Sequence, residues 1–244
     1  MIATISQNPK YYRWIILIVC FLIITFTNGL TLGGLYVFEE EIIKSLSEIT
    51  GENILRADLK LRDALTLWST AAIGFFSGML ADRIGVKKLM VTGMVILSAC
   101  FYFYGQAQSL VDMYILHIFM GLVLCISGMI VNVILISKWF NNSRGLAIGI
   151  LLAGTSVGNG LFPQINTYLL SIGDWREVML WLSFIPLCYI PFLLLLVKES
   201  PEELNQENQE SDQDFSQTNH SGGSTLKEAL STKNFWLLSL MAFC

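Results

Sequence analysis

Six long apolar stretches, free of Lys, Arg, Asp and Glu, dominate the hydrophobic pattern of this chain. A helix needs about 20 mainly apolar residues to cross about 30 Å of hydrocarbon, and each stretch approaches or exceeds that length. The stretches are residues 14–38, 64–81, 89–111, 113–137, 145–173 and 178–197. The pattern therefore predicts an all-α protein, a polytopic bundle of six complete transmembrane helices.

Short polar connections join most of these stretches. Such tight reversals make neighbouring helices antiparallel, so residues 14–197 are expected to pack as one bundle. The longer segment 39–63 is rich in acids, and we expect an outside loop there that is partly helical around residues 39–48. The short connections are residues 82–88, 106–112, 138–144 and 173–176.

The positions of Lys and Arg predict the orientation in the membrane. Cytoplasmic loops carry an excess of these residues. Segments 82–88 and 138–144 are basic, whereas 105–112 contains neither Lys nor Arg. We therefore expect residues 1–13 to be a cytoplasmic N-terminus.

Beyond the sixth stretch the composition changes abruptly. Residues 198–234 contain few apolar side chains, and we expect a polar cytoplasmic linker that cannot bury enough surface to fold alone. Residues 235–244 are apolar again. Ten helical residues reach only about 15 Å, so this segment is expected to be the truncated start of a seventh transmembrane helix.

The composition excludes several classes of protein. Only 14% of the residues are charged, against about 25% in soluble domains, and the net charge is −4. A soluble enzyme, a nucleic-acid binder and a disordered chain are excluded. The five cysteines lie in apolar stretches without metal-ligand spacing, and we interpret them as small buried hydrophobes. No catalytic constellation or phosphate loop occurs, so neither enzyme chemistry nor a cofactor or metal is expected.

The turn between the second and third stretches carries the strongest motif. Residues 78–88 read Gly-Met-Leu-Ala-Asp-Arg-Ile-Gly-Val-Lys-Lys and resemble the signature of the major facilitator superfamily between its second and third helices. Gly78 permits close helix contact, and Gly85, inside the turn, permits a reversal that a residue with a Cβ would resist. The motif residues are Gly78, Asp82, Arg83, Gly85, Lys87 and Lys88.

The resemblance implies a gating role for this turn. In the family, the aspartate pairs with a base and a helix end of the opposite half, and this contact latches the inside while the transporter is open outward. Val86 stands where the family often has another base, which weakens the expected latch. A generic basic cytoplasmic loop is the alternative interpretation.

Four residues in the apolar stretches are candidates for substrate binding or proton coupling. His117 stands where many family members have a base, and a group that titrates near neutral pH inside a membrane is a functional candidate. The alternative interpretation is that His117 is a solvated histidine near the outer membrane interface. In the family the first and fourth helices line the central cavity, so polar side chains on the corresponding stretches are candidates for substrate binding. The alternative interpretation of the asparagines among them is that their side-chain amides form hydrogen bonds between helices. The candidates are Asn28, Tyr36, His117 and Asn132.

The fifth stretch is similar to the fifth-helix motif of antiporters. Small residues at intervals of four or five let helix backbones approach, and a proline can kink the helix. Ordinary helix packing explains the pattern equally well. The residues concerned are Arg144, Gly149, Gly154, Gly158 and Pro163.

Within the superfamily, four local patterns resemble the oxalate/formate antiporter and monocarboxylate porter branch. They are Arg13-Trp14, residues 33–38, Lys138-Trp139-Phe140 with residues 144–149, and Ala229-Leu230 with residues 235–238. The resemblance implies a secondary active transporter in the plasma or inner membrane that moves a small monocarboxylate or dicarboxylate anion by alternating access, as an antiporter or proton symporter. A sugar or drug is the alternative substrate.

Alternating access needs two halves. The apolar stretches contain no Lys or Arg, and in this branch the cation for an anionic substrate commonly comes from the second half. The partners we expect are therefore the lipid bilayer, a small anion, and a missing C-terminal half or a second copy of the chain. A non-transporting membrane sensor or assembly partner, built on a transporter half, is the alternative function.

Overall fold

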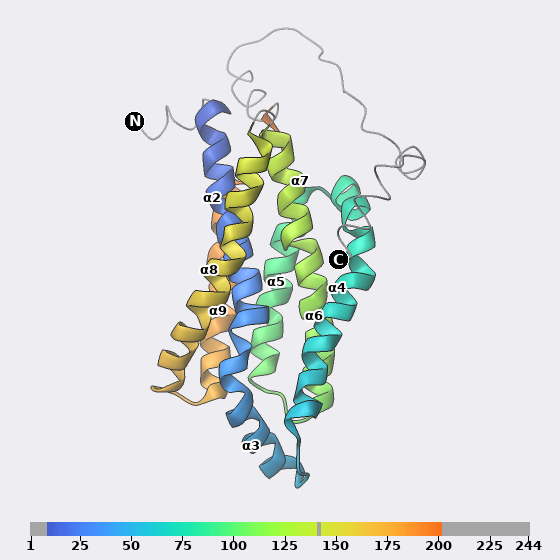
Figure 1. Cartoon of the computed structure of the whole chain (residues 1–244), viewed down its shortest axis with the longest axis vertical. Coiled ribbons are helices and arrows are strands. Elements are labelled where there is room, and N and C mark those ends of the chain that lie inside the picture. Colours follow the sequence, from blue (N-terminus) through green and yellow to red (C-terminus); the bar gives the residue numbers. More distant parts are fainter. Residues whose placement is uncertain (1–8, 141–142, 202–244) are drawn as a thin grey trace. The chain divides into compact units, whose positions relative to one another are not determined.

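The computed structural model describes residues 9–140 and 143–201. The predicted linker beyond residue 201 and the predicted seventh-helix start lie outside this part. Within the described residues there are helices and no strands, and six helical segments are long and apolar enough to cross a membrane. The all-α prediction with six spans is confirmed (Figure 1).

The first span is longer than its apolar stretch and changes helix type near its outer end. It comprises α2 (Pro9–Asn28), the π-helix η1 (Gly29–Gly33), the 3-10 helix η2 (Leu35–Phe38) and α3 (Glu39–Thr50). In the π-turn, the Gly34 N–H donates to Gly29 O at 2.7 Å. Helix α3 confirms the helix expected around residues 39–48 and ends at Gly51, which has φ +71°.

The second span corrects the predicted outside loop of residues 39–63. Helix α4 (Arg56–Ile84) begins well before residue 64, so the end of that segment is helical. The Leu55 N–H donates to the Asp58 carboxylate at 3.0 Å, which satisfies a free donor at the helix start. Charged residues that we expected in a loop therefore lie on the first turns of a membrane-spanning helix.

The fourth span is two helices rather than one. Helix α6 (Leu110–Ile126) stops at Ser127, and α7 (Met129–Trp139) begins after Gly128. The Asn132 side-chain amide donates to Ser127 O at 2.8 Å and to Gly128 O at 2.7 Å. Gly128 O also accepts the Asn132 backbone N–H at 3.3 Å, so the side-chain amide adds two hydrogen bonds across the break.

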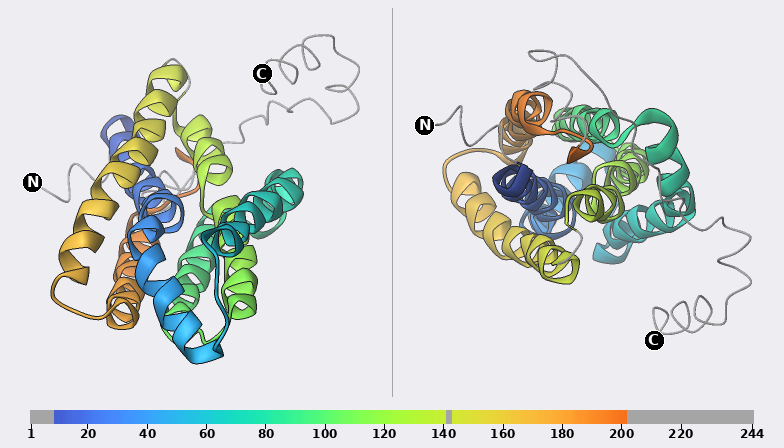
Figure 2. Two further views of the ribbon diagram at one scale, coloured as in Figure 1. Left: turned by 60° about the horizontal axis from the view of Figure 1, so that its bottom comes forward. Right: turned by 90° about the horizontal axis from the view of Figure 1, so that it is seen from above.

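Three continuous helices complete the bundle: α5 (Val86–Tyr104), α8 (Arg144–Leu170) and α9 (Trp175–Leu196). Helix α5 packs between α6 and α9, α2 packs along α8, and α4 lies against α6 (Figure 2). Pro163 lies inside α8, which continues past it to Leu170.

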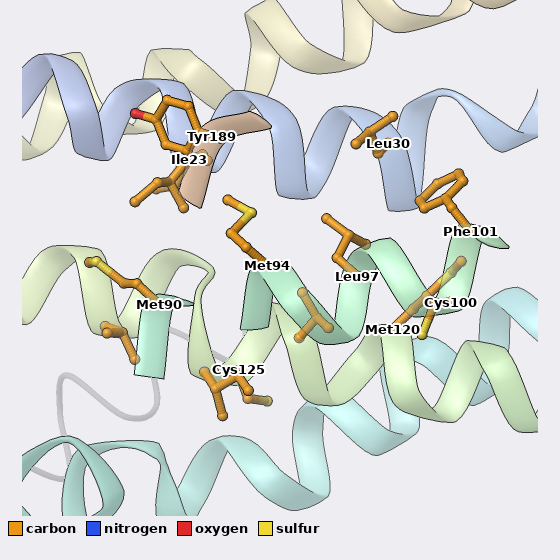
Figure 3. Close-up of a cluster of buried hydrophobic side chains, with 14 of the residues drawn as sticks. Ile23, Leu30, Met90, Met94, Leu97, Cys100, Phe101, Met120, Cys125 and Tyr189 are labelled. Carbon is orange, nitrogen blue, oxygen red and sulfur yellow. The ribbon is translucent and has the colours of Figure 1, made fainter. Parts of the chain in front are cut away.

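The apolar core lies where α2, α5 and α6 meet. Ile23 of α2 and Leu30 of η1 point toward Met94 and Leu97 of α5, and all four side chains are buried (Figure 3). Cys20, Cys100 and Cys125 are buried, as we predicted, whereas Cys188 is exposed on α9. The fifth cysteine, Cys244, lies outside the described residues.

Candidate functional site

The turn after α4 has the backbone that the motif predicts at one of its two glycines. Gly85 adopts φ +93°, a conformation that L side chains rarely adopt. At Gly78, by contrast, an added Cβ meets nothing within 4 Å in the described part of the chain. The close helix contact expected there is not found in this bundle. Asp82 and Arg83 are exposed, and neither forms an ion pair with any residue of segments 9–140 and 143–201.

Glu199, which follows α9, caps the first turn of α5. Its carboxylate accepts a hydrogen bond from the Lys87 N–H at 3.1 Å, and a Cβ on Gly85 would lie 2.6 Å from its Oε1. A carboxylate at a helix N-terminus satisfies a free donor and interacts favourably with the helix dipole. The turn is thus held from the C-terminal end of the sixth span, a contact that the sequence analysis did not predict.

Replacing Glu199 by Gln is expected to loosen this cap. The Lys87 amide should exchange its hydrogen several-fold faster, because a charge-assisted hydrogen bond becomes a neutral one. Amide hydrogen exchange followed by mass spectrometry on the peptide around Lys87 measures the effect. Glu40→Gln, on an exposed position of α3, is the matched control. Equal exchange in both variants would show that Glu199 does not hold the turn.

Aromatic side chains hold the end of α9 to two other helices near the same turn. The Tyr12 hydroxyl donates to Leu196 O at 3.0 Å, and the Trp139 indole N–H donates to Lys198 O at 3.0 Å. The Arg13 guanidinium lies 5.4 Å from the centre of the Phe140 ring. Two of the patterns that resemble the oxalate/formate antiporter and monocarboxylate porter branch are therefore in contact. They are Arg13-Trp14 and Lys138-Trp139-Phe140.

The fifth-helix motif divides into two groups of glycines. An added Cβ at Gly154 would lie 2.8 Å from Phe21 O, and one at Gly158 would lie 2.3 Å from Thr25 O. These two glycines allow α8 to contact the backbone of α2 directly. Gly149 has open space around it among the described residues, so it takes no part in this contact.

Two side-chain amides reinforce the contact between the first and fifth spans. The Asn28 side chain donates to Thr155 Oγ1 at 3.0 Å, and the Asn166 side chain donates to Gly34 O at 2.9 Å. Asn28 is 8% exposed. The hydrogen bond of Asn28 fits the alternative interpretation, in which its amide joins two helices. It lies at the edge of the contact between α2 and α8.

A buried ion-pair cluster at the outer end of the bundle was missed by the sequence analysis. Glu39, at the start of α3, lies 3.1 Å from Arg56 Nη2 and 3.4 Å from Arg62 Nη2, and it also pairs with Lys60. Its side chain is 2% exposed, and that of Arg62 is fully buried. Such charges persist in an apolar interior only when they are paired.

His117 is connected to this cluster and is not the wet interfacial histidine that we considered. It is 1% exposed, with Nδ1 2.7 Å from Thr66 Oγ1 and Nε2 3.4 Å from the Tyr104 hydroxyl. Arg62 Nη1 donates to the Tyr104 oxygen at 2.6 Å. Thr66 donates to His117 O at 3.2 Å, so its oxygen is free to accept from His117 Nδ1–H. This pattern is satisfied by a neutral imidazole whose Nε2 accepts from Tyr104.

The other two candidates differ in position. Asn132 is fully buried and serves the break before α7, so it does not line an open cavity in the described structure. Tyr36 is 51% exposed, and the Lys60 ammonium lies 4.3 Å from the centre of its ring. Of the four candidates, only Tyr36 is therefore both accessible and in contact with a cation.

The bundle of six membrane-spanning segments, with a basic turn between the second and third, defines a class, that of polytopic membrane proteins. The family model "Major Facilitator Superfamily" matches residues 21–244, and the chain belongs to this family. It is a multi-pass membrane protein, as predicted for the plasma or inner membrane.

The chain is similar to several characterised or solved family members. It is 27% identical to a gallate transporter of Pseudomonas putida over 78% of this chain and 40% of that protein. It is 28% identical to the sialic acid transporter NanX of Escherichia coli over 62% of this chain and 38% of that protein. A bacterial homolog of the human lysosomal transporter Spinster, in an inward-facing conformation, shares the fold with a TM-score of 0.66 and 22% identity, covering 95% of this chain and 52% of that one. The chain thus spans about 40% of the length of the curated relatives.

Proposed function

We propose that the chain is one half of a secondary active transporter for a small carboxylate anion. Its membership of the major facilitator superfamily carries this proposal. The names of two relatives add support, because gallate and sialic acid both carry a carboxylate at neutral pH. The basic side chains around Glu39 supply cations that the apolar stretches lack.

Transport by alternating access rocks two halves around a site near the midplane. The exposed Asp82 and Arg83 are then free to pair with a C-terminal half or with a second copy, on the cytoplasmic side. The direct backbone contact of Gly154 and Gly158 with α2 lets the first and fifth spans move together. Residues 198–234 would link the two halves, and residues 235–244 would open the seventh helix.

Coupling distinguishes an antiporter from a proton symporter. The neutral His117 already accepts from Tyr104, so a second proton on the imidazole breaks that hydrogen bond and brings a positive charge toward Arg62. We therefore favour antiport, with His117 positioning Arg62 through Tyr104.

Uptake into membrane vesicles tests the proposal. The gene, including any coding sequence after residue 244, is expressed, and uptake of labelled oxalate, formate, lactate, pyruvate and gallate is measured. We expect saturable uptake of at least one carboxylate, driven by a second carboxylate inside the vesicle. Uptake of a sugar or drug without any carboxylate would contradict the substrate class, and a stable membrane protein that moves none of them would favour a sensor or assembly partner.

The 244-residue product should behave differently when it is expressed alone. Because alternating access needs two halves, we expect no carboxylate uptake from this product unless it pairs with a second copy. The same vesicle assay measures it, with crosslinking to detect pairs. Clear uptake by a product that remains monomeric would contradict the two-half mechanism.

A further inference from the structure

We propose that Lys60, which lies over the Tyr36 ring, and Arg56 form an outer-side binding site for the substrate carboxylate, which replaces Glu39 as their partner. This inference rests on the proposed function and specifies where the anion first binds. The site lies where α3 meets the first turns of α4, at the end of the bundle opposite the start of α2 (Figure 1).

The charge balance of the cluster favours an additional anion. Arg56, Lys60 and Arg62 are paired with the two carboxylates of Glu39 and Asp63, so positive charge is in excess. Exposed acids on the same segments form no ion pair with these bases in the described part of the chain. Those acids are Glu40, Glu41, Glu48, Glu52 and Asp58. Segment 39–63 as a whole carries seven acids and four bases, so an incoming carboxylate is held by direct contact with Arg56 and Lys60 and not by the net charge of this end of the bundle.

Exposure separates the bases into two kinds. The side chains of Lys60 and Arg56 are 42% and 69% exposed, whereas that of Arg62 is fully buried beside Glu39. An anion from outside can thus reach Lys60 and Arg56 without entering the bundle. Glu39 stays paired with Arg62 when the other two bases turn to the ligand, so the exchange leaves no unpaired buried charge.

Tyr36 adds selectivity for the body of the ligand. The Lys60 ammonium lies over its ring, and the ring is half exposed. A carboxylate held by Lys60 places its carbon skeleton next to this aromatic surface. Planar aromatic acids gain stacking contact there, and short acids such as acetate do not. The site therefore favours benzoate-like anions over acetate.

Binding to the full chain in lipid nanodiscs tests the inference, with benzoate and acetate as probes and ligand-observed NMR as the readout. We expect benzoate to bind more tightly than acetate, and Lys60→Gln to weaken benzoate binding about tenfold. Tyr36→Leu should remove most of the preference for benzoate. Lys44→Gln, on an exposed base of α3 without an ion pair among the described residues, is the matched control. Circular dichroism verifies that each variant is folded.

The outcomes separate this inference from the proposed function. Benzoate binding that is unchanged in Lys60→Gln, or weakened equally in Lys44→Gln, overturns the site. If carboxylate uptake by vesicles persists with an unchanged KM in Lys60→Gln, the site is again overturned while the transporter function stands. Absence of both binding and uptake for every carboxylate overturns the proposed function and the site together.

Discussion

Replacing Arg62 by Met should destabilise the protein by about 3–5 kcal/mol, the largest loss that we expect from a single charge in this chain. The side chain is fully buried, pairs with Glu39 and Asp63, and donates to Tyr104 at 2.6 Å. Methionine fills the space but leaves a buried carboxylate and a buried hydroxyl without this partner. Chemical unfolding in detergent micelles, followed by circular dichroism, measures the loss.

Two further variants make the interpretation specific. Arg56→Met removes a base from the same carboxylate, but its side chain is 69% exposed, and we expect less than about 1 kcal/mol. Adding Glu39→Gln to the Arg62 variant removes the buried carboxylate that lost its only buried base, so part of the stability should return. Similar losses for the Arg56 and Arg62 variants would contradict a buried cluster at this end of the bundle.

Replacing Gly158 by Ala is the second substitution with a large expected effect. The new Cβ would lie 2.3 Å from Thr25 O and 3.1 Å from the Cα of Gly29, and all of these are backbone atoms that cannot rotate away. Helix α8 must then move from the first span, at a cost of about 1–3 kcal/mol or more. Thermal unfolding in detergent measures this loss.

Gly160 provides a control on the same helix. No atom of the described residues lies within 4 Å of a Cβ placed there, and alanine favours a helix over glycine by up to about 1 kcal/mol. We therefore expect the Gly158 variant to be less stable than the unchanged protein, and the Gly160 variant to be equally or more stable. Equal effects would mean that α8 does not contact the first span in the way described.

The sequence predicts the helices well because each membrane-spanning segment contains a long run of uncharged residues. A tight turn with a glycine at positive φ, such as Gly85, also follows from local chemistry. The turn of residues 82–88 does lie between the second and third spans, and residues 144–163 lie in the fifth span, whereas the gating role of the turn stays a prediction. Which glycines contact a neighbouring helix was less predictable, because Gly149 differs from Gly154 and Gly158 only in the face of α8 that it occupies.

The buried cluster was missed because Arg62 lies among other charges that resemble a solvated loop. A signal did exist: Arg62, Thr66 and Ser69 or Thr70 recur at helical spacing, which marks a polar stripe on one face of α4. That these groups meet Tyr104 and His117 depends on how α4, α5 and α6 pack together. Sequence spacing along one helix carries no information about such contacts.

The break at Gly128 has a similar explanation. Residues 113–137 form an uninterrupted apolar run, and nothing in its periodicity requires two helices. The break depends on the Asn132 side chain turning back to two carbonyls and on Gly93 of α5, where an added Cβ would lie 2.4 Å from Ser127 Oγ. The rotamer of Asn132 and the contact between Gly93 and Ser127 are determined only when the helices pack together in the folded bundle.

The fastening of the chain after α9 has a mechanical consequence. Tyr12, Trp139 and Glu199 connect residues 196–199 to α2, α7 and the start of α5. A pulling force applied to the C-terminal side would be shared among three helices instead of peeling the sixth helix from its end. In a single-molecule stretching experiment, the first rupture should therefore need a higher force in this protein than in a variant with Trp139→Phe, because that variant lacks one of the fasteners.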